Sequence, residues 1–296
     1  MSTPPRERTS DETTATKTVA LVTHTHPEQT SDAVRAAVAA AEGIAELVAP
    51  SGEIEKHGGA AEGLREVDRL PERPELCLAL GGDGTILQAL RHYSDTDVPV
   101  FGINFGTIGF LAAVEQDQLA EGLRQALAGE FETIELPGIQ TNLEGVDNPV
   151  ALNDVTFSRK PHGRVAELSY RLTGEEIGHV RCDGLVVATP VGSTGYNLAN
   201  QGPILAWGVE GYVVSFIAPH TLTARPLVVA PGDALHVSNE RGREPVDVTL
   251  DGLPVAELPS GEELTIRFRD GVGTLAQLPG ASFYRRMRDK FGRLVG

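Results

Sequence analysis

The chain is short of several residue types that define whole classes of protein. Among its 296 residues it has only two cysteines, Cys77 and Cys182, and neither a disulfide framework nor zinc-ligand spacing is present. Both cysteines lie in apolar or strand-like stretches, which predicts buried free thiols in a reducing compartment. No apolar run reaches the roughly 20 residues that a membrane-spanning helix needs. Residues 1–17 lack the apolar core of a signal peptide. We therefore expect a soluble cytoplasmic protein with a disordered tail at 1–17.

Lysine is also scarce, and the charge balance is strongly acidic. The only lysines are Lys17, Lys56, Lys160 and Lys290, and the net charge is −16. A surface of this sign repels phosphate backbones, which argues against a nucleic-acid partner. Acidic excess with few lysines is typical of adaptation to high salt, as in halophilic archaea, where screening removes the self-repulsion. A GC-rich genome would also replace lysine by arginine.

The most informative stretch is the glycine turn Gly-Gly-Asp-Gly-Thr at 81–85, which follows the apolar run 76–80 and leads into a helical pattern. Glycines let backbone N–H groups approach phosphate oxygens, and the helix offers its positive N-terminal end to the same anion. Asp83 would repel a phosphate, so it is expected to take a proton from an attacking hydroxyl or to hold a metal ion. The alternative is that Asp83 only caps the helix.

Two familiar phosphate-binding patterns do not fit this turn. The Rossmann fingerprint needs a third glycine where Leu87 stands, and the P-loop needs a Gly-Lys-Ser/Thr that occurs nowhere in the chain. The turn instead resembles that of NAD kinases, of diacylglycerol and sphingosine kinases and, in a related form, of 6-phosphofructokinases. All of these are phosphoryl transferases.

Strand and helix patterns alternate in the first part of the chain. We expect strands at 19–22, 44–48, 76–80 and 98–104, and helices at 31–41, 62–70 and 116–127. This order predicts a Rossmann-like α/β domain at 18–129 with a mainly parallel sheet, whose ligand site lies beyond the strand ends that carry Asp83 and Asn104. Short strands separated by turn residues follow from 131 to 275, which predicts a β-rich C-terminal domain at 130–275. The site is expected in the cleft between the two domains.

A second segment separates the candidate families. Residues 181–199 read Arg-Cys-Asp-Gly, a short apolar strand, then Thr-Pro-Val-Gly-Ser-Thr-Gly-Tyr and a small-residue helix, which strongly resembles the NAD kinase signature. Asn153-Asp154-Val155, the Pro-His-Thr-Leu-Thr-Ala-Arg-Pro segment within 218–227 and the basic tail 283–291 fit the same family, in order. The resemblance covers about residues 18–291. In one departure Leu253 stands where the family commonly has Gln, so a hydrogen bond from that glutamine is absent.

The resemblance implies an activity. It implies transfer of a phosphoryl group from ATP or polyphosphate to the 2′-hydroxyl of the adenosine ribose of NAD, giving NADP, with Mg²⁺ or another divalent cation on the donor phosphates. Asp83 would be the general base. The domain at 130–275 would bind the dinucleotide, and the tail at 276–296 would pack back on the first domain. The family also implies a homodimer or homotetramer in which a neighbouring subunit completes part of the site.

The resemblance further implies the residues that bind the substrates. An amide and a carboxylate at Asn153 and Asp154 match the ribose hydroxyls, and Tyr196 can lie against an adenine ring. No residue is assigned to a metal, and His220 and Arg225 are expected to hold structure around the site. The full set of implied binding residues is Gly81, Gly82, Gly84, Thr85, Phe110, Asn153, Asp154, Arg164, Arg181, Asp183, Val191, Thr194, Gly195, Tyr196, Asn197, Leu198 and Ala199.

Several of these residues also have plain structural interpretations. Asn153-Asp154 could be a turn between strands, Phe110 and Tyr196 could be core aromatics, and Arg164 could be a solvated loop residue. Two other functions also remain open. A lipid kinase shares the glycine turn, but it would usually expose an apolar or basic surface to the membrane. A catalytically silent NAD sensor would not need the Asp83 carboxylate.

Overall fold

The computed structural model of the protein describes residues 17–106, 109–239 and 243–292. The α-helices are α1 (Ser31–Ala41), α2 (Ser51–His57), α3 (Asp83–His92), α4 (Leu119–Ala128), α5 (Tyr196–Ala199) and α6 (Phe283–Phe291). Short 3-10 helices are η1 (Pro27–Gln29), η2 (Gly58–Ala61), η3 (Gln116–Gln118) and η4 (Gly192–Thr194). The strands are β1 (Lys17–Thr23), β2 (Ala45–Pro50), β3 (Arg65–Val67), β4 (Leu76–Gly81), β5 (Pro99–Asn104), β6 (Val114–Glu115), β7 (Glu132–Thr141), β8 (Val150–Ala151), β9 (Asp154–Arg159), β10 (Ala166–Leu172), β11 (Glu175–Cys182), β12 (Gly184–Ala188), β13 (Tyr212–Ile217), β14 (Leu227–Val229), β15 (Leu235–Ser238), β16 (Val246–Leu250), β17 (Leu253–Leu258) and β18 (Glu263–Gln277).

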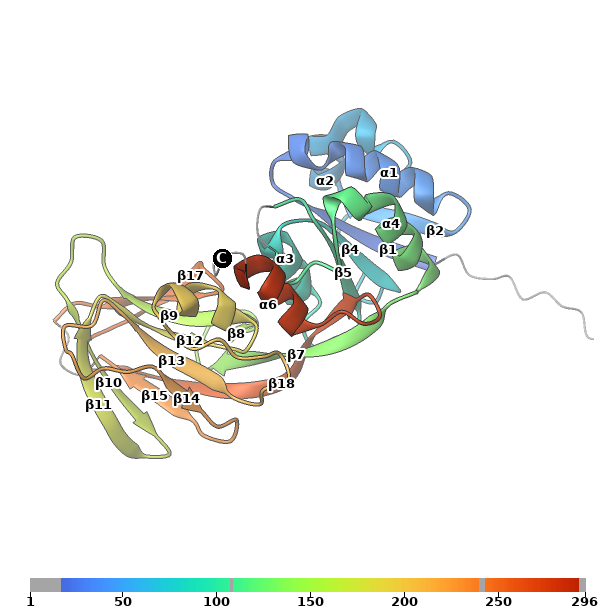
Figure 1. Cartoon of the computed structure of the whole chain (residues 1–296). Helices are drawn as coiled ribbons and strands as arrows, with labels where there is room; N and C mark the ends of the chain where they lie inside the picture. Colours follow the sequence, from blue (N-terminus) through green and yellow to red (C-terminus); the bar gives the residue numbers. More distant parts are fainter. Residues whose placement is uncertain (1–16, 107–108, 240–242, 293–296) are drawn as a thin grey trace, which may run out of the picture.

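The N-terminal half forms a parallel sheet with helices on both faces (Figure 1). Strands β3, β2, β1, β4 and β5 lie side by side, and every pair of neighbours is parallel. Along β4, side chains alternate between the two faces, as the pleat requires. Leu78 packs with Val34 of α1 and Leu123 of α4, whereas Cys77 packs with Ile86 of α3. The expected parallel α/β sheet is confirmed.

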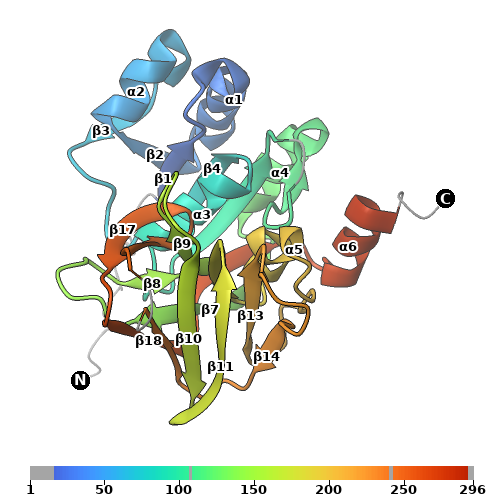
Figure 2. The same cartoon turned by 90° about the vertical axis from the view of Figure 1, so that its left-hand side faces the viewer.

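The C-terminal half is built from antiparallel strands in two layers (Figure 2). One layer is a six-stranded sheet in the order β14-β13-β12-β9-β16-β17. The other contains β11, β10 and β15, and its core is shared with the first layer through residues such as Phe157, Leu185, Val237 and Ile266. The expected β-rich part of the chain is therefore confirmed.

Strand β18 joins the two halves. Its first residues pair with β15, while Thr274–Ala276 pair in parallel with Pro99–Phe101 of β5. The first sheet thereby continues through β18 into the β-rich half, and the sequence pattern gave no sign of this continuity. The division of the chain into domains at 18–129 and 130–275 stays a prediction.

The helix expected at 62–70 is wrong. Gly58–Ala61 form η2, and Arg65–Val67 form β3, which pairs with Val48–Pro50 of β2. Gly63 has a φ of 102°, a conformation that a helix does not accommodate. The open edge of β2 offers residues 65–67 inter-strand hydrogen bonds, and this tertiary pairing overrides their local preference for a helix. The helix in this region is α2, which lies immediately after β2.

Two expectations from composition can be compared with the fold. Cys77 and Cys182 are both buried and free, as their apolar surroundings predicted. No helix in the described part of the chain is long and apolar enough to cross a membrane.

Candidate functional site

The glycine turn joins β4 to α3, as its sequence predicts. Gly81 must be a glycine because a Cβ there would lie 2.2 Å from Thr85 Oγ1. Gly82 is the N-cap of α3, Asp83 is the first helical residue, and no side chain caps this helix. The alternative of Asp83 as a helix cap is therefore wrong. The N–H of the buried Thr85 donates to Gly82 O at 3.0 Å, whereas Gly84 has open space on its Cβ side.

The Asp83 carboxylate accepts hydrogen bonds from the segment that follows β5. Phe110 N–H donates to Asp83 Oδ2 at 2.8 Å and to Oδ1 at 3.1 Å, and Leu111 N–H donates to Oδ1 at 3.0 Å. Burial raises the pKa of Asp83, while these two N–H groups and the charges of Arg286 and Lys290 act in the opposite direction. The carboxylate is thus held by backbone donors and lies within reach of two cations.

Phe110 is buried as well as bound to Asp83. It is 5% exposed, and its ring centroid lies 5.4 Å from that of Phe291 in α6. This packing fits the interpretation of Phe110 as a core aromatic. A role in an adenine pocket stays a prediction for this residue.

The Asn153-Asp154 pair lies in the turn that leads into β9. Asn153 Oδ1 is buried and has no hydrogen-bond partner among the described residues. Asp154 is 8% exposed and accepts a hydrogen bond from Thr156 Oγ1 at 3.0 Å. Burial, with a smaller contribution from Asp251, raises the pKa of Asp154 to about 6. A buried acceptor without a partner costs free energy, so this turn is suited to a ligand that brings hydroxyl donors.

Asp251 holds this turn, a role that the sequence pattern did not reveal. Its carboxylate accepts the backbone N–H groups of Leu152 at 3.1 Å, Asn153 at 2.6 Å and Asp154 at 3.2 Å. Arg91 of α3 places Nε 3.7 Å from Oδ2 of the same carboxylate. The sequence signal at this position is the Asp-Gly pair at 251–252, which precedes Leu253. Asp251 therefore ties the turn to the helix that begins at Asp83.

The segment 191–199 packs on the same turn. A Cβ on Gly192 would lie 2.0 Å from Asn153 O, so only glycine allows this approach. Thr189 N–H donates to Asn153 O at 2.9 Å. Val191 is buried in one cluster with Ile86 and Leu90 of α3. The structure thus brings the glycine turn's helix, the Asn153 turn and the 191–199 segment together.

Within that segment the side chains differ in accessibility. Tyr196 is 45% exposed, so the alternative of Tyr196 as a core aromatic is wrong. Gly195 and Ala199 are also exposed, while Thr194 and Leu198 are partly buried. Asn197 is fully buried, and its Nδ2 donates to Ser193 O and to Pro203 O, both at 3.0 Å. Asn197 therefore holds the local backbone.

Arg181 and Asp183 lie away from the Asn153 turn. Strands β9 and β12 pair Asp154 with Ala188 and Ser158 with Gly184. Four residues of strand, about 14 Å, therefore separate Asp154 from the end next to Asp183. At that far end Asp183 Oδ1 accepts from Arg159 Nε at 2.6 Å, and the exposed Arg181 places Nε 3.4 Å from Glu167. Within a single chain, Arg181 and Asp183 therefore do not lie next to the Asn153 turn.

Arg164 also lies outside the group of residues at the turn. It is exposed in the loop between β9 and β10, and its backbone N–H donates to Glu244 Oε2 at 3.0 Å. This exposure fits the interpretation of a solvated loop arginine.

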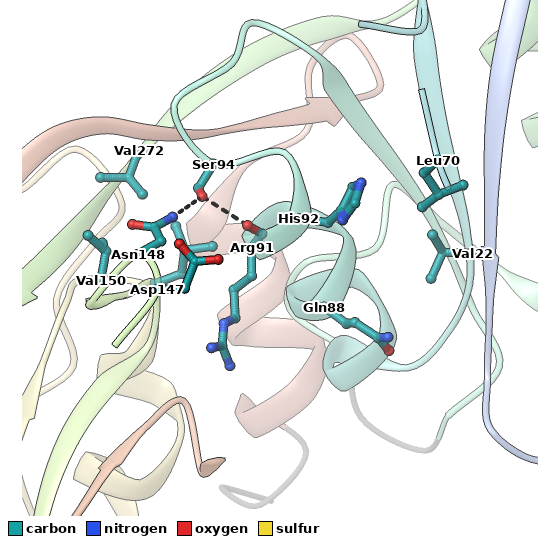
Figure 3. A pocket seen from close by; sticks show the side chains of 11 residues that line it. Val22, Leu70, Gln88, Arg91, His92, Ser94, Asp147, Asn148, Val150 and Val272 are labelled. Atoms are coloured by element: carbon teal, nitrogen blue, oxygen red, sulfur yellow. Dashed lines mark hydrogen bonds between the residues drawn. The ribbon is translucent and has the colours of Figure 1, made fainter. Parts of the chain in front are cut away.

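A cavity of about 500 Å³ lies beside α3 (Figure 3). Gln88, Arg91 and His92 line it from the helix, and Asp147 and Asn148 line it from the β7–β8 connection. None of the residues that the sequence assigned to substrates lines this cavity. Its wall includes Leu152 and Arg91, however, and these adjoin the Asn153 turn and Asp251.

The fold and the site together define a class of protein. A parallel α/β sheet with a glycine turn before a helix N-terminus suits a bound phosphate, and the partly buried Asp83 carboxylate beside it suits proton transfer from a hydroxyl. Asn153 Oδ1, which has no hydrogen-bond partner in the described part of the chain, suits the hydroxyls of a sugar. These features are those of a phosphotransferase that acts on a nucleotide.

Comparisons with known proteins specify the family. Residues 12–131 match the ATP-NAD kinase N-terminal domain, and residues 152–272 match the ATP-NAD kinase C-terminal domain. The NAD kinase of Gemmatimonas aurantiaca is 34% identical over 240 residues, which cover 79% of this chain and 82% of that protein. The NAD kinase of Geotalea daltonii is 32% identical over 255 residues, covering 84% and 88%.

Solved structures agree with these matches. An NAD kinase from Archaeoglobus fulgidus in complex with ATP has a TM-score of 0.69 at 25% identity, covering 94% of this chain and 98% of that one. Yeast NADH kinase complexed with NADH shares the fold, with a TM-score of 0.81 at 20% identity over 94% and 88% of the two chains. The chain belongs to the NAD kinase family, so the resemblance inferred from its motifs is confirmed. It is an enzyme that phosphorylates NAD.

Proposed function

We propose that this enzyme transfers the terminal phosphoryl group of ATP or polyphosphate to the 2′-hydroxyl of the adenosine ribose of NAD, with Asp83 as the general base. The observation that carries the proposal is the partly buried Asp83 carboxylate at the first residue of α3, next to the glycine turn. Burial raises the pKa of Asp83, which brings a carboxylate closer to the range in which it accepts a proton efficiently near neutral pH. The two N–H groups from Phe110 and Leu111 orient its oxygens.

The acceptor ribose is assigned to the Asn153 turn. The buried Asn153 Oδ1 lacks a partner among the described residues, and the Asp154 carboxylate can accept further hydrogen bonds. Two vicinal hydroxyls would satisfy both groups. This would hold the ribose in the cleft between the domains at 18–129 and 130–275, because α3 and the 191–199 segment pack around the same turn.

The donor phosphates are assigned to the glycine turn, where N–H groups at the start of α3 point outward. Mg²⁺ on the donor would neutralise developing charge during transfer. No group of three or more metal-ligating side chains occurs among the described residues. Mg²⁺ in phosphoryl-transfer enzymes is commonly held by only one or two carboxylates together with the substrate phosphates. A site without a larger group of protein ligands is compatible with such an ion.

The second part of the dinucleotide is assigned to a neighbouring subunit. Arg181 and Asp183 are separated from the Asn153 turn of their own chain by about 14 Å along the strands. In a homodimer or homotetramer they could reach the site of another copy. Measuring the mass of the assembled protein by light scattering, with wild type beside Arg181→Glu, tests this part of the proposal.

The working environment is also part of the proposal. The net charge of −16 with four lysines supports a cytoplasm of high salt concentration. Under those conditions the acidic surface would repel the anionic substrates only at short range, because the Debye length falls to about 3 Å at 1 M salt.

One assay tests the reaction itself. The purified protein is incubated with NAD and Mg²⁺ and either ATP or polyphosphate, and the product is identified by mass spectrometry and by its use as a substrate of an NADP-specific dehydrogenase. We expect NADP to form with at least one of the two donors. Parallel reactions with NADH in place of NAD measure the preference between these two acceptors. Absence of NADP with both donors, across low and molar salt, would overturn the proposal.

A further inference from the structure

The C-terminal helix α6 places one arginine against the segment that holds Asp83. Arg286 Nη1 donates to Phe110 O at 2.9 Å and also to Ala112 O, and Arg286 Nη2 donates to Gln277 Oε1. Gln277 Nε2 in turn donates to Leu111 O at 2.8 Å. The carbonyl groups of three consecutive residues, 110–112, are thus all bound by Arg286 or Gln277.

The N–H groups of Phe110 and Leu111 donate to the carboxylate of Asp83. One peptide group is shared between the two contacts: its carbonyl is Phe110 O, which accepts from Arg286, and its N–H belongs to Leu111, which donates to Asp83 Oδ1 at 3.0 Å. Hydrogen bonds in series polarise one another, so a guanidinium on the carbonyl strengthens the N–H as a donor. Arg286 is therefore coupled to the carboxylate through a single peptide unit.

The guanidinium of Arg286 contacts neutral groups. Its described hydrogen bonds go to neutral oxygens of residues 110, 112 and 277, and its guanidinium lies 5.6 Å from the centre of the Trp207 ring. Burial lowers the pKa of Arg286, and the charges of Asp83 and Glu115 oppose that effect. Burying a cation costs free energy, and neutral partners offset only part of that cost.

We propose that Arg286 is a positioning residue for phosphoryl transfer. It fixes and polarises the Phe110–Leu111 peptide group, and this group orients the Asp83 carboxylate toward the acceptor hydroxyl. The inference rests on the proposed function, in which Asp83 is the general base. Small displacements of a reacting group cost up to about 10²-fold in rate, so the effect of Arg286 should appear in kcat.

The test compares Arg286→Gln with Arg288→Gln, a matched change on the same helix. Arg288 has a side chain that is 71% exposed and pairs only with its neighbour Asp289 among the described residues. We expect Arg286→Gln to lower kcat by about 10- to 100-fold with KM for NAD changed less than about two-fold, and Arg288→Gln to behave as wild type. Any of three outcomes would overturn the proposal. They are a near-wild-type kcat in a folded Arg286→Gln, an equal loss of kcat in Arg288→Gln, and a loss of activity that lies entirely in KM for NAD.

The pH profile of kcat separates positioning from simple support of the fold. Arg286 and Lys290 from α6 are the cations that lower the pKa of Asp83, and Lys290 also pairs with Glu115 at 3.1 Å. Among the described residues, the hydrogen bonds to the carboxylate come from the backbone N–H groups of Phe110 and Leu111. Loss of Arg286 should therefore move the acid limb of the profile to higher pH. Loss of kcat with an unmoved acid limb would indicate a structural role and would overturn the inference.

A second variant keeps the test decisive if Arg286→Gln does not fold. Arg286→Lys retains the cation but cannot reach both Phe110 O and Gln277 with one rigid fork. We expect a partial loss of kcat with the acid limb near its wild-type position, and wild-type kcat in this variant would overturn the proposal. Asp83→Asn in the same assay separates the two proposals. If this variant stays active, the assignment of Asp83 as the general base is wrong. If it is inactive while both Arg286 variants are fully active, only the proposed role of Arg286 is wrong.

Discussion

Asn153 N–H donates to Asp251 Oδ1 at 2.6 Å although 98 positions separate the two residues in the chain. The same carboxylate accepts two more backbone N–H groups and lies 3.7 Å from Arg91 Nε. The Asn153 turn is therefore not an independent loop. Its shape depends on one buried aspartate that also contacts the helix behind the glycine turn.

Replacement of Asp251 by alanine should destabilise the fold. It leaves three backbone N–H groups and Arg91 without their acceptor, and removing one partner of a buried pair costs about 3–5 kcal/mol. Urea unfolding measures the loss, with exposed Asp270→Ala as the control. An Asp251→Ala protein as stable as this control would show that the turn keeps its shape without the carboxylate.

Asp83→Asn should lower kcat by about 10²- to 10⁴-fold, the span expected for loss of general base catalysis. NAD binding should change little, or tighten, because a like charge near the phosphates disappears. Calorimetric titration with NAD beside an assay for NADP measures both effects. Exposed Asp117→Asn is the control, and near-wild-type turnover in Asp83→Asn would show that another group takes the proton.

Asn153→Ala should raise KM for NAD while leaving KM for the phosphoryl donor near its wild-type value. The reason is that we propose a ribose hydroxyl, and not the donor phosphates, as the partner of Asn153 Oδ1, which has none within the described ranges. Initial rates with each substrate varied in turn give the two constants. The opposite pattern, with only the donor KM raised, would move Asn153 to the donor side of the site.

Asp154→Asn should stabilise the folded state at neutral pH and not at acidic pH. The pKa of Asp154 is raised from 3.8 to about 6 in the folded protein, so the folded state binds a proton more readily than the unfolded one. The stability that this group contributes is present below about pH 4 and is lost as the pH rises through about 6. At pH 7.5 the variant should therefore exceed wild type by up to about 3 kcal/mol.

Urea unfolding at pH 4 and pH 7.5 checks this sign. The gap between the two proteins should be much smaller at pH 4, because Asp154 is then neutral in the folded wild type and about half protonated in the unfolded one. Exposed Asp270→Asn should follow wild type at both values. A gap between wild type and Asp154→Asn that is equal at the two pH values would contradict the assignment of a raised pKa.

The acidic surface predicts salt dependence. Molar KCl shortens the range of charge repulsion to about 3 Å, so the melting temperature and the NAD kinase rate should both be higher there than in dilute buffer. Thermal melts across a KCl series test the first, and a coupled assay tests the second. A melting temperature that stays flat or falls with salt would rule out adaptation to high salt.

Local sequence determined the elements whose signals are local. The helix expected at 31–41 is observed as Ser31–Ala41, and the apolar run 76–80 is observed as β4. The glycine turn also forms where its sequence predicts it, and Gly81 lies so close to Thr85 that there is no room for a Cβ at position 81. The mistaken helix at 62–70 arose where sheet pairing at the edge of β2 outweighed local preference.

Within the site, the sequence identified Asp83, Asn153 and the 191–199 segment as candidates through their residue types and order. It assigned no role to Asp251 or to Arg286, which appeared only as part of an Asp-Gly pair and of a basic tail. Their partners lie far away in the chain, as Arg286 and Phe110 do, 176 positions apart.

The sequence by itself determined which chemical groups the protein carries and which short turns and helices present them. Tertiary structure alone decided which groups meet: Asp83 with the 110–112 segment, that segment with Arg286, and the Asn153 turn with Asp251. The physical reason is that these contacts follow from the pairing of β4 with β5, of β18 with β5 and of β16 with β9. Residue spacing along the chain does not encode such long-range registers, because they form only when buried apolar faces pack together and bring distant backbone groups into hydrogen-bond range.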